Sequence, residues 1–159
     1  MAESSLLTEE IRRMVGQEFV KPVVREVEKG AIQRFARAIE DPNPLWQDEE
    51  YAKKARYGGI IAPPVFPNSL QPEGAISLAA QERLLEIAGS GKTGMVGGAE
   101  YEWFQPIRPG DVITVTSKVV DAREREGKLG KMLILVYELT FTNQRGEVVA
   151  KERTTALIY

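Results

Sequence analysis

After residue 92 the hydrophobic positions of the chain repeat with a period of two, which is the period of a β-strand. Ala99, Tyr101 and Trp103 alternate in this way with their neighbours. Three further runs, at 112–120, 132–142 and 147–158, are rich in β-forming residues and are separated by turn sequences that contain glycine. This part of the chain is therefore predicted to form an antiparallel meander.

The first half of the chain predicts one strand and several helices. Residues 19–27 form a β-rich run in which Pro22 marks a strand edge or a strand start. A helical period follows, carried by the apolar residues Ile32, Phe35, Ala36 and Ile39. The dipeptide Asp41-Pro42 ends this helix, because the residue before a proline is disfavoured in the helical conformation.

A longer helix is predicted between Pro72 and Ala88, and its apolar residues cover more than one face. Such a helix is typical of a buried position. A short helix is expected after the N-cap residue Thr8, and one or two more turns are expected over residues 48–56. The simplest packing is a strongly curved antiparallel sheet of about five strands around the long central helix. We therefore predict a single α+β domain over residues 1–159.

The composition, with 43% hydrophobic and 28% charged residues, is that of a water-soluble globular protein. Basic and acidic residues are interspersed and the net charge is −2, so no nucleic-acid partner is expected. No apolar run approaches the roughly 18 residues of a membrane span, and Met-Ala-Glu-Ser-Ser at the N-terminus has no signal-peptide pattern. We expect a cytoplasmic protein without a membrane partner.

The chain contains neither cysteine nor histidine. Disulfides, thiolate catalysis and cysteine-based zinc sites are therefore excluded. The usual serine triad and imidazole metal ligands are excluded as well. Acid/base chemistry is left to carboxylates, lysine and tyrosine, and no metal or cofactor is expected.

One segment carries a recognisable motif, Asp41-Pro42-Asn43-Pro44-Leu45-Trp46, followed by five residues and then Ala52. It resembles the signature D-x-N-P-x-H-x5-A of the MaoC-like enoyl-thioester hydratases, except that Trp46 stands at the histidine position. The resemblance extends over nearly the whole chain and implies the hot-dog fold. It is strongest to the N-terminal half, or separate partner subunit, of two-part dehydratases. These also carry segments similar to 62–66 and 106–111.

In that family an Asp/His pair performs the proton chemistry, and an N–H group at the start of the central helix stabilises the thioester oxyanion. Asp41 matches the catalytic Asp, and Asn43 is expected to hold the loop shape. Taken alone, Asp41 and Asn43 are also good turn residues. The resemblance further implies substrate contacts near the segment that precedes the central helix. The residues expected to bind substrate are Trp46, Pro64, Val65 and Phe66.

Three positions depart from the family pattern. The indole of Trp46 donates one hydrogen bond and cannot shuttle protons, so it serves either as a core or interface aromatic or as a ligand contact. Pro64 falls where active relatives have the glycine whose N–H meets the oxyanion, and proline has no N–H. Glu40 stands where the family usually has glycine.

Three functions are therefore open. The first is a non-catalytic or half-site subunit of an enoyl-CoA or enoyl-ACP hydratase/3-hydroxyacyl dehydratase, which is a lyase of fatty acid metabolism. Such a subunit would shape the acyl pocket within a homodimer or within a heterodimer with a catalytic MaoC-like subunit. The second is a self-sufficient hydratase that uses Asp41. The third is a hot-dog thioesterase or an acyl-thioester binding module.

Overall fold

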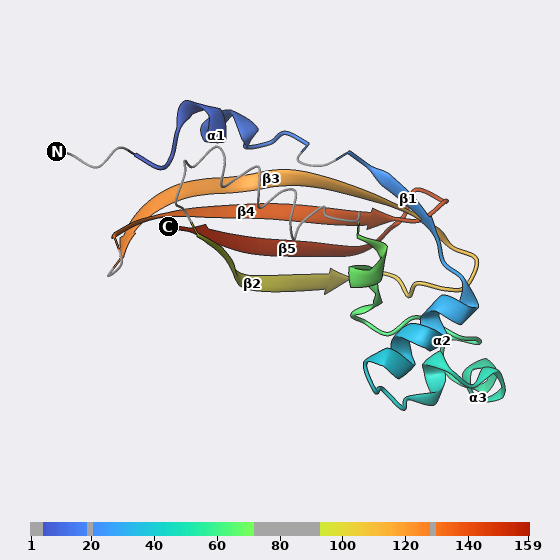
Figure 1. Cartoon of the computed structure of the whole chain (residues 1–159). Coiled ribbons are helices and arrows are strands. Elements are labelled where there is room, and N and C mark those ends of the chain that lie inside the picture. The colour runs from blue at the N-terminus through green and yellow to red at the C-terminus, as the bar shows by residue number, and fades with distance from the viewer. Residues whose placement is uncertain (1–4, 19–20, 72–92, 128–129) are drawn as a thin grey trace.

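The computed structural model describes residues 5–18, 21–71, 93–127 and 130–159, and Figure 1 shows the order of its elements. The helices are α1 (Glu9–Met14), α2 (Lys29–Ala38) and α3 (Glu49–Lys54), with the 3-10 turns η1 (Pro44–Trp46) and η2 (Phe66–Leu70). The strands are β1 (Val23–Glu26), β2 (Gly94–Trp103), β3 (Val112–Gly127), β4 (Gly130–Thr142) and β5 (Val148–Ile158). The long helix predicted from Pro72 to Ala88 lies outside the described residues. Within the four described ranges, no helix is long and apolar enough to cross a membrane.

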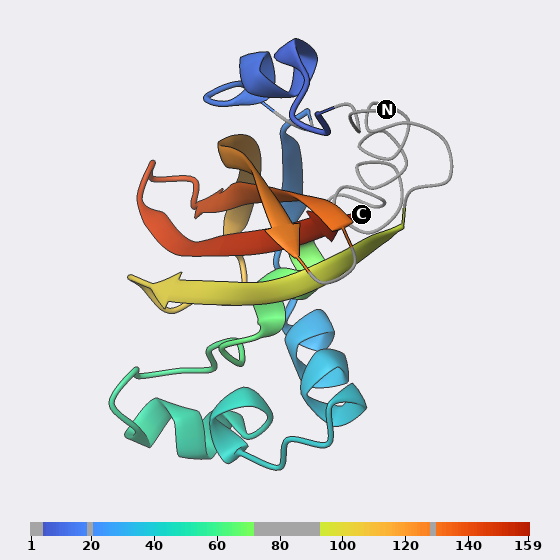
Figure 2. The same ribbon diagram turned by 90° about the vertical axis from the view of Figure 1, so that its left-hand side faces the viewer.

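The five described strands form one antiparallel sheet in the order β1-β3-β4-β5-β2. The long strands β3, β4 and β5 make its curved centre (Figure 1), and the view turned by 90° shows how strongly the sheet twists (Figure 2). The strands β1 and β2 form its two edges. The predicted α+β class is confirmed, and so is the sheet of one early and four late strands.

Two strand boundaries differ from the sequence prediction. Strand β1 begins only after Pro22, because a proline cannot donate to the strand ladder. Strand β3 does not end at Val120 but continues to Gly127, after an irregularity in its pairing with β4 between Val119 and Asp121. The charged residues of this extension hid the strand in the sequence. In the sheet they pair with residues 131–136 of β4, where Lys131 Nζ lies 3.9 Å from Glu124 Oε1.

Two apolar clusters cover the inner face of the sheet, the face that carries α1, α2 and η2. At one end, Ile11 of α1 packs with Leu133 and Val119 of the sheet. At the other end, Ile32 of α2 and Phe66 of η2 belong to a larger cluster that includes residues of β3, β4 and β5, such as Phe141. The helices at the two ends are well separated in Figure 1. Each cluster therefore buries one end of the inner face.

Helix α2 ends at Ala38, three residues before the predicted stop at Asp41-Pro42, and its end has a defined geometry. The N–H of Glu40 donates to the carbonyl of Arg37 (3.1 Å), and the N–H of Asp41 donates to the carbonyl of Ala36 (2.9 Å). These two bonds form a Schellman motif, with Glu40 in the left-handed region (φ 54°). Glu40 is the only non-glycine residue with positive φ among the described residues. The position therefore requires a backbone conformation that glycine adopts most readily, and Glu40 adopts it here.

A row of charges crosses the outer face of the sheet. Cross-strand neighbours alternate in sign along it, in the order Glu18, Lys118, Glu138, Arg153 and Glu100. Glu138 is only 3% exposed, and its carboxylate accepts from Arg153 Nε (2.8 Å) and lies 3.4 Å from Lys151 Nζ. Burial alone would raise the pKa of Glu138, but the hydrogen bond from Arg153 and the two positive charges outweigh it and hold the pKa below its ordinary value.

A second buried carboxyl group, that of Glu152, lies on the inner face. Its oxygens accept from the hydroxyl of Thr154 (2.8 Å) and from the side-chain amide of Gln71. Burial raises the pKa of Glu152 above its ordinary value, and the polar groups around it offset that rise only in part. The neighbouring Tyr137 is also buried, which raises the pKa of its phenol to about 12.

The buried Glu152 predicts a pH dependence of stability. A carboxyl group whose pKa is raised by folding holds its proton better in the folded chain than in the unfolded one. Its contribution to the free energy of unfolding is therefore complete below pH 4.5, the ordinary pKa of the group. The contribution is lost as the pH rises through the higher pKa of the folded chain. We expect the stability of the wild type relative to Glu152→Gln to fall between about pH 4.5 and about pH 7.5.

Urea unfolding of both proteins at both pH values measures this change, with the exposed Glu126→Gln as the control that shows no such trend. An equal difference between wild type and Glu152→Gln at the two pH values would contradict the prediction.

Candidate functional site

The motif segment folds into a compact turn held by its own side chains. The N–H of Asn43 donates to Asp41 Oδ1 (3.0 Å), and Asn43 Oδ1 accepts from the N–H of Leu45 (3.0 Å), which caps η1. The side-chain amide of Gln47 donates to the carbonyl of Asp41 (2.9 Å). Asp41 and Asn43 thus fix the conformation of the loop.

The aromatic residue at the histidine position binds the aspartate of the motif directly. Nε1–H of Trp46 donates to Asp41 Oδ2 at 2.8 Å, and the Trp46 side chain is buried. Each carboxylate oxygen of Asp41 therefore accepts a hydrogen bond, one from the indole and one from the N–H of Asn43. The indole nitrogen has no lone pair with which to accept a proton. This Asp–Trp pair can hold a loop in place but cannot move a proton between its members.

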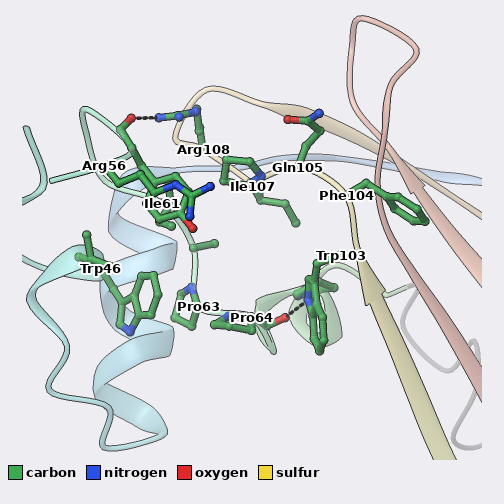
Figure 3. A pocket seen from close by; sticks show the side chains of 15 residues that line it. Trp46, Arg56, Ile61, Pro63, Pro64, Trp103, Phe104, Gln105, Ile107 and Arg108 are labelled. Atoms are coloured by element: carbon green, nitrogen blue, oxygen red, sulfur yellow. Dashed lines mark hydrogen bonds between the residues drawn. The ribbon is translucent and has the colours of Figure 1, made fainter.

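A cleft of about 620 Å³ opens beside this loop, and Figure 3 shows it from close by. Trp46 and Trp103 lie at its two sides with Pro63 and Pro64 between them, and Arg56 and Arg108 lie together on a third side (Figure 3). The other lining residues are Leu45, Tyr57, Ile61, Ala62, Pro67, Phe104, Gln105, Pro106 and Ile107. Asp41, in contrast, does not line the cleft. Trp46 is the member of the motif that faces it.

Pro64, the residue at the expected oxyanion position, lines the cleft without offering a donor. Its carbonyl instead accepts a hydrogen bond from Trp103 Nε1 (2.8 Å). The N–H of the nearby Ala62 is also used, since it donates to the carbonyl of Ile107 (2.8 Å). The two departures of the motif, at Trp46 and Pro64, thus both lie at the surface of one cleft.

Two residues expected to contact substrate lie elsewhere. Phe66 is 2% exposed and packs edge-to-face against Phe35, with ring centroids 5.4 Å apart. Its side chain is therefore part of the core. Val65 is exposed and precedes η2, but it is not among the residues that line the cleft.

Several cleft residues were not identified from the sequence. Arg56 and Tyr57 follow α3, whereas Trp103, Phe104 and Arg108 belong to the end of β2 and the loop after it. The only local sign of the cleft in the sequence is the pair Trp103-Phe104, two consecutive large aromatic residues. In the structure both lie at the end of β2 and stay about half exposed. In the part of the chain that is described, no group of three or more acidic, histidine or cysteine residues could hold a metal ion.

Comparison with known proteins gives the chain its relatives. The family described as "FAS1-like, dehydratase domain region" matches residues 13–152. A UPF0336 protein of Thermobifida fusca is 34% identical over 147 residues, which is 92% of each chain. A probable enoyl-CoA hydratase alpha subunit of Thermomonospora curvata is 28% identical over 132 residues, covering 77% of this chain and 41% of that protein.

Solved structures agree with this assignment. The MaoC-like dehydratase from Rhodospirillum rubrum is 28% identical, covers 91% of this chain and 92% of its own, and superposes with a TM-score of 0.67. The ChsH1-ChsH2 complex from Mycobacterium tuberculosis, 20% identical, covers 94% of this chain and 88% of its own with a TM-score of 0.77, and it shows the shared fold. With its five-stranded antiparallel sheet and a family match over residues 13–152, the chain belongs to the FAS1-like dehydratase family of MaoC-like, hot-dog proteins.

Proposed function

We propose that this protein is a non-catalytic or half-site subunit of an enoyl-CoA or enoyl-ACP hydratase/3-hydroxyacyl dehydratase, and that it shapes the acyl-thioester pocket. We propose further that it acts in the cytoplasm, as the sequence predicts. Family membership supports the reaction class. The observation that carries the non-catalytic role is the hydrogen bond from Trp46 to Asp41.

Hydration of an enoyl thioester needs a base for water, a proton donor for the α-carbon and a donor for the oxyanion. The chain has no histidine, and both oxygens of Asp41 already accept hydrogen bonds from their own loop. The described lining of the cleft contains no carboxylate. Pro64 offers no N–H at the expected oxyanion position. These observations favour a cleft that binds an acyl thioester without performing the proton transfers.

A pairing partner would supply the missing groups, and β2 is the favoured edge for it. β2 spans ten residues along an open edge, whereas β1 at the opposite edge spans four. Met95 and Val96 of β2 are exposed, as are Trp103 and Phe104 at its end, where the cleft lies. A subunit that adds a strand to β2 would therefore border the cleft. The ChsH1-ChsH2 and HadBC complexes are structural neighbours that consist of two different subunits.

The charge row on the outer face favours a partner that differs from this chain. The row ends at the β2 edge with Glu100, so the complementary residue on an added strand is a lysine or arginine. Strand β2 itself contains no basic residue. A second copy paired through β2 would therefore bring no cation to Glu100, whereas a different MaoC-like subunit with the intact D-x-N-P-x-H motif can do so.

The first prediction concerns activity. The purified chain should hydrate crotonyl-CoA no faster than buffer, because loss of the general acid/base costs on the order of 10²–10⁴-fold and loss of an oxyanion donor a further 10²–10³-fold. Trp46→His combined with Pro64→Gly should give a weak gain at best, since catalytic geometry tolerates little error. Robust turnover by the unmodified chain that Asp41→Asn abolishes would establish a self-sufficient hydratase instead.

The second prediction concerns the loop. Trp46→Phe keeps an aromatic ring but removes the N–H donor, and it leaves Asp41 Oδ2 without its partner. We expect a loss of about 1–2 kcal/mol in the free energy of unfolding, as for a hydrogen bond to a partly buried charged group. Trp103→Phe is the matched control, because it removes an indole bond to the neutral carbonyl of Pro64 at an exposed residue and should cost less. Equal losses in urea unfolding would contradict a special role for the Trp46–Asp41 bond.

The third prediction concerns assembly. In the absence of a different partner, a second copy can still occupy the open β2 edge. Light scattering of the chain alone at micromolar concentration should therefore give the mass of a dimer or larger, and Val96→Lys on β2 should reduce it to that of one chain. Val24→Lys is the matched control, because Val24 is similarly exposed but lies on the opposite edge strand, β1. When a MaoC-like subunit with the intact motif is co-expressed, we expect a mixed complex that Val96→Lys weakens. A wild-type mass of one chain with no co-purified partner would argue against the half-site proposal.

A further inference from the structure

Two arginines of the cleft form no ion pair with an acidic side chain in the described part of the chain. Arg56 and Arg108 both line it and lie on the same side (Figure 3). No aspartate or glutamate lines the cleft, and neither guanidinium forms an ion pair with a carboxylate of the described residues. Arg108 also borders a second hollow that contains Glu49, but that carboxylate pairs with Lys29. A chain of net charge −2 thus holds two positive charges and no described negative one in this cleft.

Both arginines are oriented by the same residue, Tyr57. Arg108 donates from Nη1 to the carbonyl of Tyr57 (2.9 Å), and the guanidinium carbon of Arg56 lies 5.7 Å from the centroid of the Tyr57 ring. A guanidinium has five N–H donors in a rigid fork, so one bond to a carbonyl leaves most of them available. Because the half-buried Arg108 is already held in place, less entropy is lost when it binds an anion.

Apart from Gln105, the other residues that line the cleft are apolar or aromatic. Trp46 and Trp103 form its sides, and prolines form much of the surface between them. A ligand that fits has an anionic group next to the arginines and a long, weakly polar arm along the aromatic walls. We infer that Arg56 and Arg108 form an anion-binding site for a phosphate group of the phosphopantetheine arm of an acyl thioester, whether that arm belongs to coenzyme A or to a carrier protein. The identity of this ligand rests on the proposed function.

Intrinsic tryptophan fluorescence can report binding at this site. The chain has two tryptophans, and both line the cleft, so intrinsic fluorescence responds to its occupancy. The experiment titrates the full chain with pantetheine, 4′-phosphopantetheine and coenzyme A and measures quenching. We expect 4′-phosphopantetheine to bind about tenfold or more tightly than pantetheine, and we expect this preference to weaken at high salt.

Variants that remove one positive charge test whether Arg56 and Arg108 cause the preference for 4′-phosphopantetheine. Arg56→Gln and Arg108→Gln should each reduce the phosphate preference about tenfold and leave the affinity for pantetheine unchanged. Arg37→Gln is the matched control, because Arg37 is an exposed arginine of α2 that does not line the cleft. If Arg108→Gln lowers the melting temperature through loss of its bond to Tyr57, the exposed Arg56 still carries the test. If coenzyme A and 4′-phosphopantetheine bind with equal affinity, the arginines bind the phosphate of the arm. If coenzyme A binds more tightly, they bind the nucleotide phosphates instead.

The inference is overturned if pantetheine and its phosphate bind equally, or if the preference survives both glutamine variants. Neither outcome depends on turnover, so failure of the anion site is distinguishable from failure of the proposed function, which is decided by crotonyl-CoA hydration. Phosphate preference in a chain that also hydrates crotonyl-CoA alone would keep the anion site and discard only the non-catalytic role.

Discussion

The inner face of the sheet has to be covered, and this constraint places the helices that the structure describes. Strands β3, β4 and β5 bury apolar side chains on that face, among them Ile113, Leu135 and Ile158. Helix α1 covers one end, and α2 with η2 covers the other. Since Phe66 anchors η2 in the core, the segment just before it is fixed against the loop after β2. The cleft lies where these two segments meet.

The motif loop keeps a defined architecture although Trp46 stands at the histidine position of the signature. Asp41 still follows the end of α2 through a Schellman motif, and Asn43 still caps η1. In a proton-transfer pair, one partner must be able to accept what the other donates. Trp46 only donates, so the carboxylate becomes an anchor for the buried indole. The same six residues thus keep their structural task and give the cleft an aromatic wall.

Much of the fold could be predicted from the sequence, because period-two runs and turn residues determine strands locally. A helix end ahead of Pro42 followed from similar local rules, although the helix already stops at Ala38. The extension of β3 was missed because its charged residues read as a turn, and their pairing with an apolar partner strand is visible only in three dimensions. For the site, the loop residues followed from the motif. Arg56 and Arg108 did not, because they are far apart in sequence and meet only through their shared contacts with Tyr57.

The alternating charges across the outer face also specify how the strands align. A slip of one residue between β4 and its neighbours would turn Glu138 toward the inner face, among leucines, which is prohibitively unfavourable. A slip of two keeps Glu138 on the outer face but sets Lys118 opposite Val136 or Thr140, so that the two opposite charges no longer face each other. The hydrophobic pattern of these strands repeats every two residues, so alignments that differ by two residues bury the same face. The row of charges therefore favours one of these alignments over the others.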